Sequence, residues 1–192
     1  MNNDAHFVLC VVHLCVSVSK SIISLVCYSD ASFGNLVSGH SQGAYVVFIV
    51  DKYGRANVLS WQSRKIKRVC NSTLSAECLA AVEAVNASIY LKTLVKEMIG
   101  AKCTNLKVRL VVDNKALLDA ISSKSSVEDK RLRIDISLLR ECISNKDING
   151  IYWVASHDNL ANALTKQGAS HSKLIEALNG QCKFDFSKNI FV

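Results

Sequence analysis

The feature that most constrains the fold is a change in the spacing of apolar residues near residue 72. Before this point, three apolar runs at 22–28, 44–50 and 56–63 are rich in β-branched residues, and a turn at 51–55 separates the last two. Such runs are typical of strands, and the short connections between them favour an antiparallel meander. The first third of the chain is therefore predicted to form three adjacent strands.

After residue 72 the apolar residues recur at the spacing of a helix. The recurring positions are Leu74, Cys78, Ala81, Val85, Ile89, Leu94 and Met98. This pattern predicts a long amphipathic helix, with Ser72 or Thr73 as its N-cap.

The remaining chain alternates strands with helices. Strands are predicted at 106–112 and 150–156, and helices at 115–123, 127–145, 159–166 and 172–179, the last two broken at Gly168. The helix at 127–145 is expected to place Ile134, Leu138, Leu139 and Ile143 on one face. The element order β-β-β-α-β-α-α-β-α predicts an α/β fold: one five-stranded mixed sheet, with three antiparallel strands and then parallel ones, and helices packed on it.

The composition fits one globular domain with short extensions. The chain has 192 residues, of which 49% are hydrophobic and 20% charged, and its formal net charge is +7. We expect a domain at 24–180, a hydrophobic N-terminal extension at 1–23 and a C-terminal tail at 181–192. The positive charge suits a polyanionic partner such as nucleic acid, although many basic proteins bind none.

Two features bear on the compartment. The eight cysteines form no CxxC pair and no zinc-finger spacing, which favours reduced thiols with no disulfide partner over a secreted disulfide framework. Residues 7–19 resemble a signal-peptide core, but no Lys or Arg precedes them and no A-x-A-like site follows. The run also falls short of the roughly 18 unbroken apolar residues of a membrane helix. We expect an intracellular protein, in cytoplasm or nucleus, whose N-terminal segment is a packed strand or helix or the remnant of a larger protein, with a signal anchor as the alternative.

Three acidic residues stand at positions where the predicted fold would bring them together. Asp30 ends the first predicted strand, Asp113 ends the fourth, and Glu77 lies about one turn into the long helix. If the two strands are neighbours, the three carboxylates share one site, and their mutual repulsion then requires cations. Oxygen ligands select hard ions, Mg²⁺ or Mn²⁺. The alternative is that each aspartate is an ordinary turn or cap residue.

The chain resembles the ribonuclease H domain of copia-type retrotransposon Pol polyproteins. The similarity rests on YSDASFGNL, HSQGAYVVFIVD, LSWQSRKIKRV, NSTLSAECLA, VVDNKALLDAI, DKRLRIDISLLRE and WVASHDNLANALTKQGAS, which occur in family order over about residues 26–180. The resemblance implies a ribonuclease H-like fold and Mg²⁺-dependent cleavage of the RNA strand of an RNA–DNA hybrid. It also implies that Asp30, Glu77 and Asp113 are the catalytic, metal-binding acids.

One position departs from the family pattern. The family motif resembles LADALTK, with an aspartate as fourth metal ligand, and this chain has Asn162 there. A neutral amide oxygen can ligate weakly or orient a water, so a second metal ion is expected to bind less well. Asp158, one predicted helical turn earlier, could supply the missing charge, with an N-cap role as the alternative. His157 resembles a histidine that assists product release in some ribonucleases H; a solvated loop histidine is the alternative.

Basic and polar residues near the acids are candidates for nucleic-acid binding. Arg64, Lys65, Lys67 and Arg68 cluster before the long helix, and Lys124, Lys130, Arg131 and Arg133 form a second group at the start of a later one. Lys and Arg contacts to phosphates give sequence-independent affinity, although a charge run is often simply solvated. Ser32 and Asn114 could contact the backbone of a bound strand or be turn or cap residues. Trp61 and Trp153 are expected in the core.

The sequence therefore predicts a two-metal endonuclease, derived from a retroelement and acting on RNA–DNA hybrids. Such a domain follows a reverse transcriptase in a complete element, and no polymerase is present in this chain. We expect a monomer. The alternatives are a relic that binds hybrid or RNA without cutting, which Asn162 favours, and an ordinary α/β interaction domain.

Overall fold

The structure is a computed structural model that describes residues 23–99, 106–123, 127–180 and 184. The predicted N-terminal extension, apart from Ile23, and the predicted C-terminal tail, apart from Phe184, lie outside the described residues. The predicted domain boundaries therefore stay predictions. Four cysteines fall within the described part, and all four are free thiols: Cys27, Cys70, Cys78 and Cys142.

The centre of the domain is one five-stranded sheet with strand order β3-β2-β1-β4-β5. The strands are β1 (Ser24–Ser32), β2 (Gln42–Val50), β3 (Ala56–Lys65), β4 (Lys107–Val112) and β5 (Ile151–Trp153). β1 pairs antiparallel with β2, and β2 pairs antiparallel with β3. β4 pairs parallel with β1 and with β5, so the predicted mixed sheet is confirmed.

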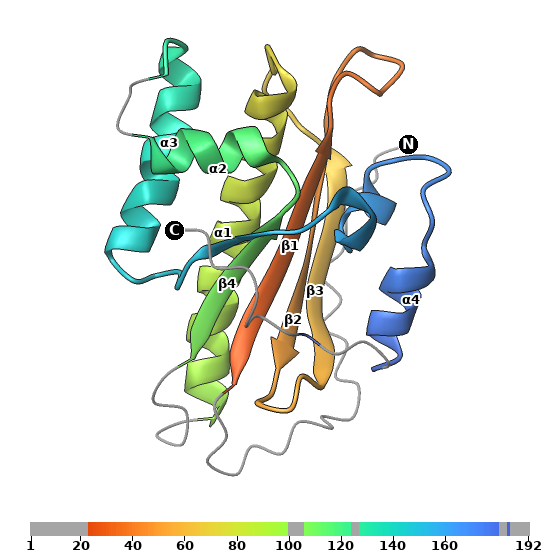
Figure 1. The fold of residues 1–192 in the computed structure, drawn as a ribbon, viewed down its shortest axis with the longest axis vertical. Coiled ribbons are helices and arrows are strands. Elements are labelled where there is room, and N and C mark those ends of the chain that lie inside the picture. The colour runs from red at the N-terminus through yellow and green to blue at the C-terminus, as the bar shows by residue number, and fades with distance from the viewer. Residues whose placement is uncertain (1–22, 100–105, 124–126, 181–183, 185–192) are drawn as a thin grey trace.

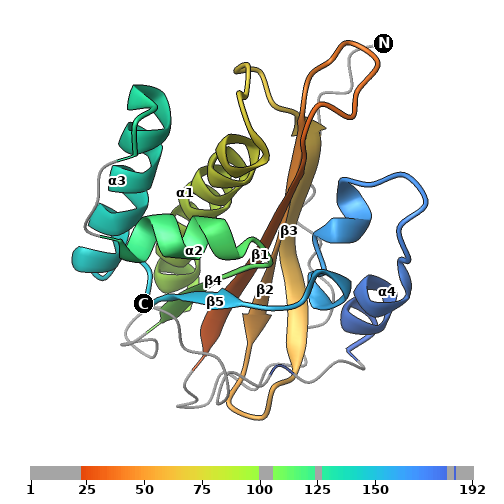
Figure 2. The same ribbon diagram turned by 45° about the horizontal axis from the view of Figure 1, so that its top comes forward.

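Helices cover one face of the sheet, and the C-terminal segment, residues 160–178, covers the other. α1 (Thr73–Ile99), α2 (Lys115–Ser122) and α3 (Lys130–Ser144) lie on the first side, and α4 (Ser172–Leu178) lies on the second, as Figures 1 and 2 both show. In β1, Leu25 and Cys27 enter the core beneath α1, whereas Val26 and Tyr28 enter the core beneath the C-terminal segment. Burial on both faces explains why the strands are continuous apolar runs rather than alternating ones.

α1 is the core helix of the domain. Its start is capped as expected, because the Ser72 hydroxyl accepts a hydrogen bond from the Ser75 backbone N–H at 3.1 Å. Its length and apolar composition are also those of a membrane-spanning helix, with a mean hydropathy of 1.4 over its most apolar window. Its buried residues pack on β1, β2 and β4, so its apolar composition is explained by the core.

α3 departs from the prediction in its start and in its buried face. It begins at Lys130 rather than 127, where the Asp129 carboxylate accepts hydrogen bonds from the first-turn N–H groups. Of the residues predicted on one face, Leu139 is fully buried, whereas Ile134 is 67% exposed. The face that is buried consists of Leu132, Asp135, Ile136 and Leu139. Apolar spacing missed this register because one of the four buried residues is an acid.

The predicted helix at 159–166 is wrong. The segment instead contains one 3₁₀ turn, Asn162–Leu164, and another, Ser156–Asp158, immediately precedes it. The Asn159 side chain bonds to the backbone of its own segment and of β1, which competes with a regular helix. Gly168, at a φ of +81°, then reverses the chain ahead of α4.

Candidate metal centre

The three predicted acids meet at the carboxyl ends of β1 and β4. In the parallel pairing of these strands, Tyr28 is opposite Val111, and two residues further along each chain stand Asp30 and Asp113. Glu77 reaches the same point from the second turn of α1, which packs across β1. One carboxylate oxygen of each residue lies within 4.8 Å of the other two. The predicted convergence of the acids is confirmed.

The carboxylates are buried and incompletely hydrogen-bonded. Asp30 is 0% and Glu77 6% exposed, and Asp113 is half-buried. Among the described residues, Asp30 Oδ1 and Glu77 Oε2 have no hydrogen-bond partner. Buried acceptors of this kind are rare unless a cation or water satisfies them. Carboxylate oxygens are the donor set that Mg²⁺ and Mn²⁺ prefer, so the residues present fit such an ion.

The environment disfavours charge on these acids when no cation is bound. Burial raises the pKa of Glu77 to about 9, and the neighbouring Asp30 and Asp113 carboxylates add to the rise. Burial also raises the pKa of Asp30, against a hydrogen bond from Thr165 and the charge of Lys166, which lower it. A divalent ion that binds here must therefore displace a proton.

Two residues of the C-terminal segment contact Asp30 directly. The Thr165 hydroxyl, which is buried, donates a hydrogen bond to Asp30 Oδ2. The Lys166 ammonium lies 3.5 Å from Asp30 Oδ1 and donates a hydrogen bond to Asn162 Oδ1. Asn162, the predicted fourth ligand, is thus linked to Asp30 through Lys166.

Asn159 ties the two strand ends together. Its Nδ2 donates to the Ser29 backbone carbonyl at 2.9 Å and to Asp113 Oδ1 at 3.1 Å. Its Oδ1 accepts from the Ala161 N–H at 3.1 Å, so the buried amide is bonded at both ends. Trp153 Nε1 donates to the Asp113 backbone carbonyl at 2.9 Å. These bonds fix the position of Asp113 next to β1.

Sequence reasoning missed Asn159, Thr165 and Lys166 as parts of the site. The sequence could have indicated them, because all three lie in the same NLANALTK stretch as Asn162. The expectation of a helix there hid them. In a helix Thr165 would point away from the face shared by Asn159 and Lys166, whereas here all three residues contact Asp30 or Asp113.

Asp158 and His157 lie outside the group of three acids that the described residues bring together. The Asp158 carboxylate forms an ion pair with Lys173 of α4. His157 is exposed, with Nε2 3.3 Å from Asp158 Oδ2. The expected helical turn between Asp158 and Asn162 is absent, so a helix does not bring the Asp158 charge beside Asn162.

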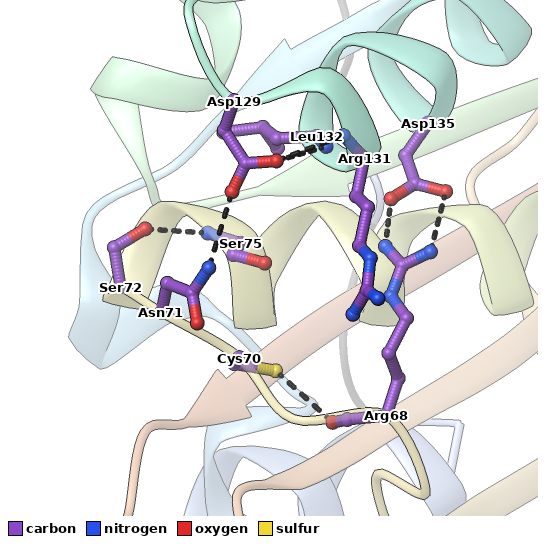
Figure 3. Close-up of polar contacts among 9 residues, drawn as sticks. All are labelled: Arg68, Cys70, Asn71, Ser72, Ser75, Asp129, Arg131, Leu132 and Asp135. Atoms are coloured by element: carbon purple, nitrogen blue, oxygen red, sulfur yellow. Dashed lines mark hydrogen bonds and ion pairs between the residues drawn. The ribbon is translucent and has the colours of Figure 1, made fainter.

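The first basic group is partly engaged with acids of the domain. Arg64 forms an ion pair with Glu83 at 2.7 Å. Arg68 forms a two-pronged pair with Asp135 of α3, which anchors the loop before α1 to that helix (Figure 3). Lys65 and Lys67 are exposed. All four basic residues line a groove of about 350 Å³ between the β2–β3 pair and α1.

The loop before α1 and the start of α3 are joined by a second contact beside this ion pair. Asp129 Oδ1 accepts from the N–H groups of Arg131 and Leu132 at 2.8 and 3.2 Å, and its Oδ2 accepts from Asn71 at 3.4 Å (Figure 3). Lys130, Arg131 and Arg133 of the second basic group flank this junction, and Lys124 lies outside the described residues.

The other predicted contacts have mixed outcomes. Asn114 is the N-cap of α2, with Oδ1 accepting from the Leu117 N–H at 3.0 Å. Ser32 is half-buried at the end of β1. Trp61 is 56% exposed, so its predicted core position is wrong; it lines an apolar groove between β3 and α4. Trp153 is half-buried, with the Lys115 ammonium 4.5 Å from its ring centroid.

Comparison with known proteins identifies the fold. No protein-family model matches the chain, and no curated protein matches it in sequence. Ribonuclease H1 from the archaeon Halobacterium salinarum NRC-1 superposes with a TM-score of 0.51 at 17% identity, over 81% of this chain and 98% of its own. LC11 ribonuclease H1, isolated from compost by a metagenomic approach, superposes with a TM-score of 0.50 at 15% identity, over 80% of this chain and 98% of its own.

A second LC11 structure, determined in complex with an RNA/DNA hybrid, superposes with a TM-score of 0.50 at 15% identity, over 79% of this chain and 99% of its own. Together these superpositions and the sheet order show that the chain has a ribonuclease H-like fold. At this level of identity the superpositions show the fold alone.

Proposed function

We propose that this domain is an endonuclease that hydrolyses the RNA strand of RNA–DNA hybrids with divalent metal ions. The observation that carries the proposal is the cluster of Asp30, Glu77 and Asp113, whose incompletely hydrogen-bonded carboxylates fit a divalent cation on a ribonuclease H-like fold. The capture of a hybrid by the LC11 enzyme supports the choice of substrate.

In this proposal each residue of the site has a defined role. Asp30, Glu77 and Asp113 would hold a divalent ion, and the chemistry that such an ion would supply is activation of a water and stabilisation of the leaving oxygen of the phosphodiester. Thr165 holds Asp30 Oδ2, and Asn159 holds Asp113 Oδ1, so both carboxylates keep one orientation. The two-metal mechanism implied by the resemblance needs a second cation beside Asp30, and Asn162 adds no negative charge to attract it.

The substrate would be held through its backbone. Lys65 and Lys67 are exposed along the groove beside α1, where they can contact phosphates. Arg64 and Arg68 would share their charge between the substrate and the acids Glu83 and Asp135. The 2′-hydroxyl of the RNA strand is the group that would distinguish a hybrid from duplex DNA.

The test is hydrolysis of an end-labelled hybrid by the full chain in Mg²⁺ and in Mn²⁺, with duplex DNA and single-stranded RNA as controls. We expect cutting of the RNA strand of the hybrid that Asp30→Asn abolishes. Asp119→Asn is the matched control, because it removes one exposed carboxylate of α2 and should leave the rate unchanged. Equal rates for the wild type and Asp30→Asn would contradict the proposal.

The second candidate is a relic that binds hybrid or RNA without cutting. Asn162 favours it, since a neutral amide stands where the copia-type motif has an aspartate. Retained, salt-sensitive binding of the hybrid with no cutting in either metal would support the relic. An ordinary α/β interaction domain would show no salt-dependent affinity for hybrids.

Origin, partners and location complete the proposal. The order of the copia-like motifs supports descent from a retroelement, in which a reverse transcriptase domain would accompany this one. We propose that the protein acts as a monomer inside the cell, in cytoplasm or nucleus. Gel filtration with and without hybrid would test the monomer, because a dimer would elute at twice the mass.

A further inference from the structure

We propose that Lys166 is a built-in cation of the metal centre and takes the place of a second divalent ion. Asp30, Glu77 and Asp113 would then hold a single Mg²⁺ or Mn²⁺. This inference rests on the proposed metal-dependent function and specifies how many ions the site accepts and what supplies the remaining charge.

The contacts of Lys166 place its ammonium between the two groups that a second ion would need. The ammonium lies 3.5 Å from Asp30 Oδ1, one of the two carboxylate oxygens of the described cluster that accept no hydrogen bond. It also donates a hydrogen bond to Asn162 Oδ1, the oxygen at the expected fourth-ligand position. A divalent ion bridging Asp30 and Asn162 would have to displace the ammonium from both.

The backbone next to Lys166 is fixed in this position. Thr165 is 2% exposed, and its hydroxyl donates to Asp30 Oδ2 and lies 3.2 Å from the Asn162 carbonyl oxygen. Two neighbouring residues of one turn therefore contact the two oxygens of the same carboxylate, Thr165 one and Lys166 the other. The ammonium is held at the site by a short, anchored stretch of chain.

The charges agree with a one-ion site. Three ionised carboxylates carry three negative charges, which one divalent ion and one ammonium together neutralise. An aspartate at position 162 would bring the carboxylates to four, which two divalent ions would neutralise without Lys166. The copia-type motif LADALTK has the same lysine, so it is the neutral amide of Asn162, together with the contacts of Lys166, that favours one ion over two.

The experiment counts bound ions directly. Mn²⁺ is titrated into the full chain, and free Mn²⁺ is measured by its electron paramagnetic resonance signal, with no substrate present. We expect one bound Mn²⁺ per wild-type chain. Lys166→Met should bind its first ion about tenfold more tightly, because a positive charge near Asp30 is lost from a partly solvated position. Lys166→Met combined with Asn162→Asp should bind two ions.

Two further variants serve as controls. Lys173→Met removes a lysine of α4 with nearly the same side-chain exposure, 46% against 42% for Lys166, and should leave Mn²⁺ affinity unchanged. Lys166→Arg keeps the positive charge and should keep one ion. Thermal unfolding of each variant verifies its fold, and Lys166→Gln replaces Lys166→Met if the latter does not fold.

Two bound ions in the wild type, or an unchanged affinity in both Lys166→Met and Lys166→Gln, would overturn the inference. No bound Mn²⁺ in the wild type would overturn it together with the metal-dependent function. One bound ion without hybrid cleavage would uphold the inference and reject only the proposed activity, so the two failures are distinguishable.

Discussion

The two halves of the candidate site are built in different ways. Asp30, Asp113 and Glu77 come from regular elements, two parallel strand ends and a long helix, and their backbone positions follow from the sheet order. The segment 156–168 is irregular apart from two short 3₁₀ turns, and its own side chains hold it in place. The regular half supplies the ligands, and the irregular half determines how those ligands are oriented and how much charge surrounds them.

The largest effect should come from the regular half. Glu77→Gln keeps the shape of the side chain but removes one of the three charges that hold the ion. We expect hybrid cleavage to fall about a thousandfold, equivalent to about 4 kcal/mol in the activation barrier. Single-turnover rates in saturating Mg²⁺ measure this. A loss below tenfold would show that the acid from α1 is not a ligand.

The pH dependence of the free energy of unfolding should report on the buried acids of the regular half rather than on the segment 156–168. Folding raises the pKa of Glu77 from 4.5 to about 9, so between these values the folded state binds more protons than the unfolded state. The free energy of unfolding of the metal-free protein should therefore be highest below about pH 4.5 for this group and fall as the pH rises towards 9. Asp30, whose pKa is also raised, acts in the same direction.

Urea unfolding in the presence of a chelator, at several pH values, measures this fall. Saturating Mg²⁺ should remove it, because the ion stabilises the ionised carboxylates, and Glu77→Gln should reduce it. A metal-free protein that gains stability from pH 6 to pH 9 would contradict the assigned burial of these acids.

A smaller effect is expected from the irregular half. Asn159→Ala removes the bonds that hold Asp113 Oδ1 and the Ser29 carbonyl together. Residues that orient metal ligands typically contribute about ten- to a hundredfold in metal affinity, and we expect a loss of that size in Mn²⁺ affinity.

Asn149→Ala is the matched control for Asn159→Ala. The Asn149 side chain also bonds to β4, through the Val108 N–H at 2.9 Å, but at the end of the strand away from Asp113. It should lower stability without changing Mn²⁺ affinity. Equal losses of affinity in both variants would show that Asn159 acts only through the general stability of the sheet.

The smallest effect should come from restoring charge to the irregular half. Asn162→Asp should raise hybrid cleavage about fivefold, roughly 1 kcal/mol, because a carboxylate beside Asp30 strengthens cation binding. Asn162→Ala, which loses the bond to Lys166 without gaining charge, should not raise it. An unchanged rate in Asn162→Asp would refute the account of this position as a weakened fourth ligand.

The regular half could be predicted from sequence because its signals are local. Apolar runs and their connections defined the strands, and the placement of Asp30 and Asp113 at two strand ends needed only that these strands pair. Both faces of the sheet are covered, so the runs were continuous and easily found. The confirmed cluster of three acids follows from this arrangement.

The rest could not be predicted because it depends on contacts between distant residues. The turns at 156–164 depend on a bond from Asn159 to β1, 130 positions away in the chain. The buried face of α3 includes Asp135, which apolar spacing excludes, and this acid is buried because Arg68 pairs with it. Trp61 is exposed because β3 is an edge strand that α4 covers only in part.

Both halves of the site have a role only if Asp30, Glu77 and Asp113 bind one divalent cation together. The most direct test is anomalous diffraction from crystals of the protein grown with Mn²⁺. We expect a strong anomalous peak in contact with a carboxylate oxygen of each of these three residues, with Lys166 beside it. Mn²⁺ bound elsewhere, with the three carboxylates contacting no ion, would contradict it.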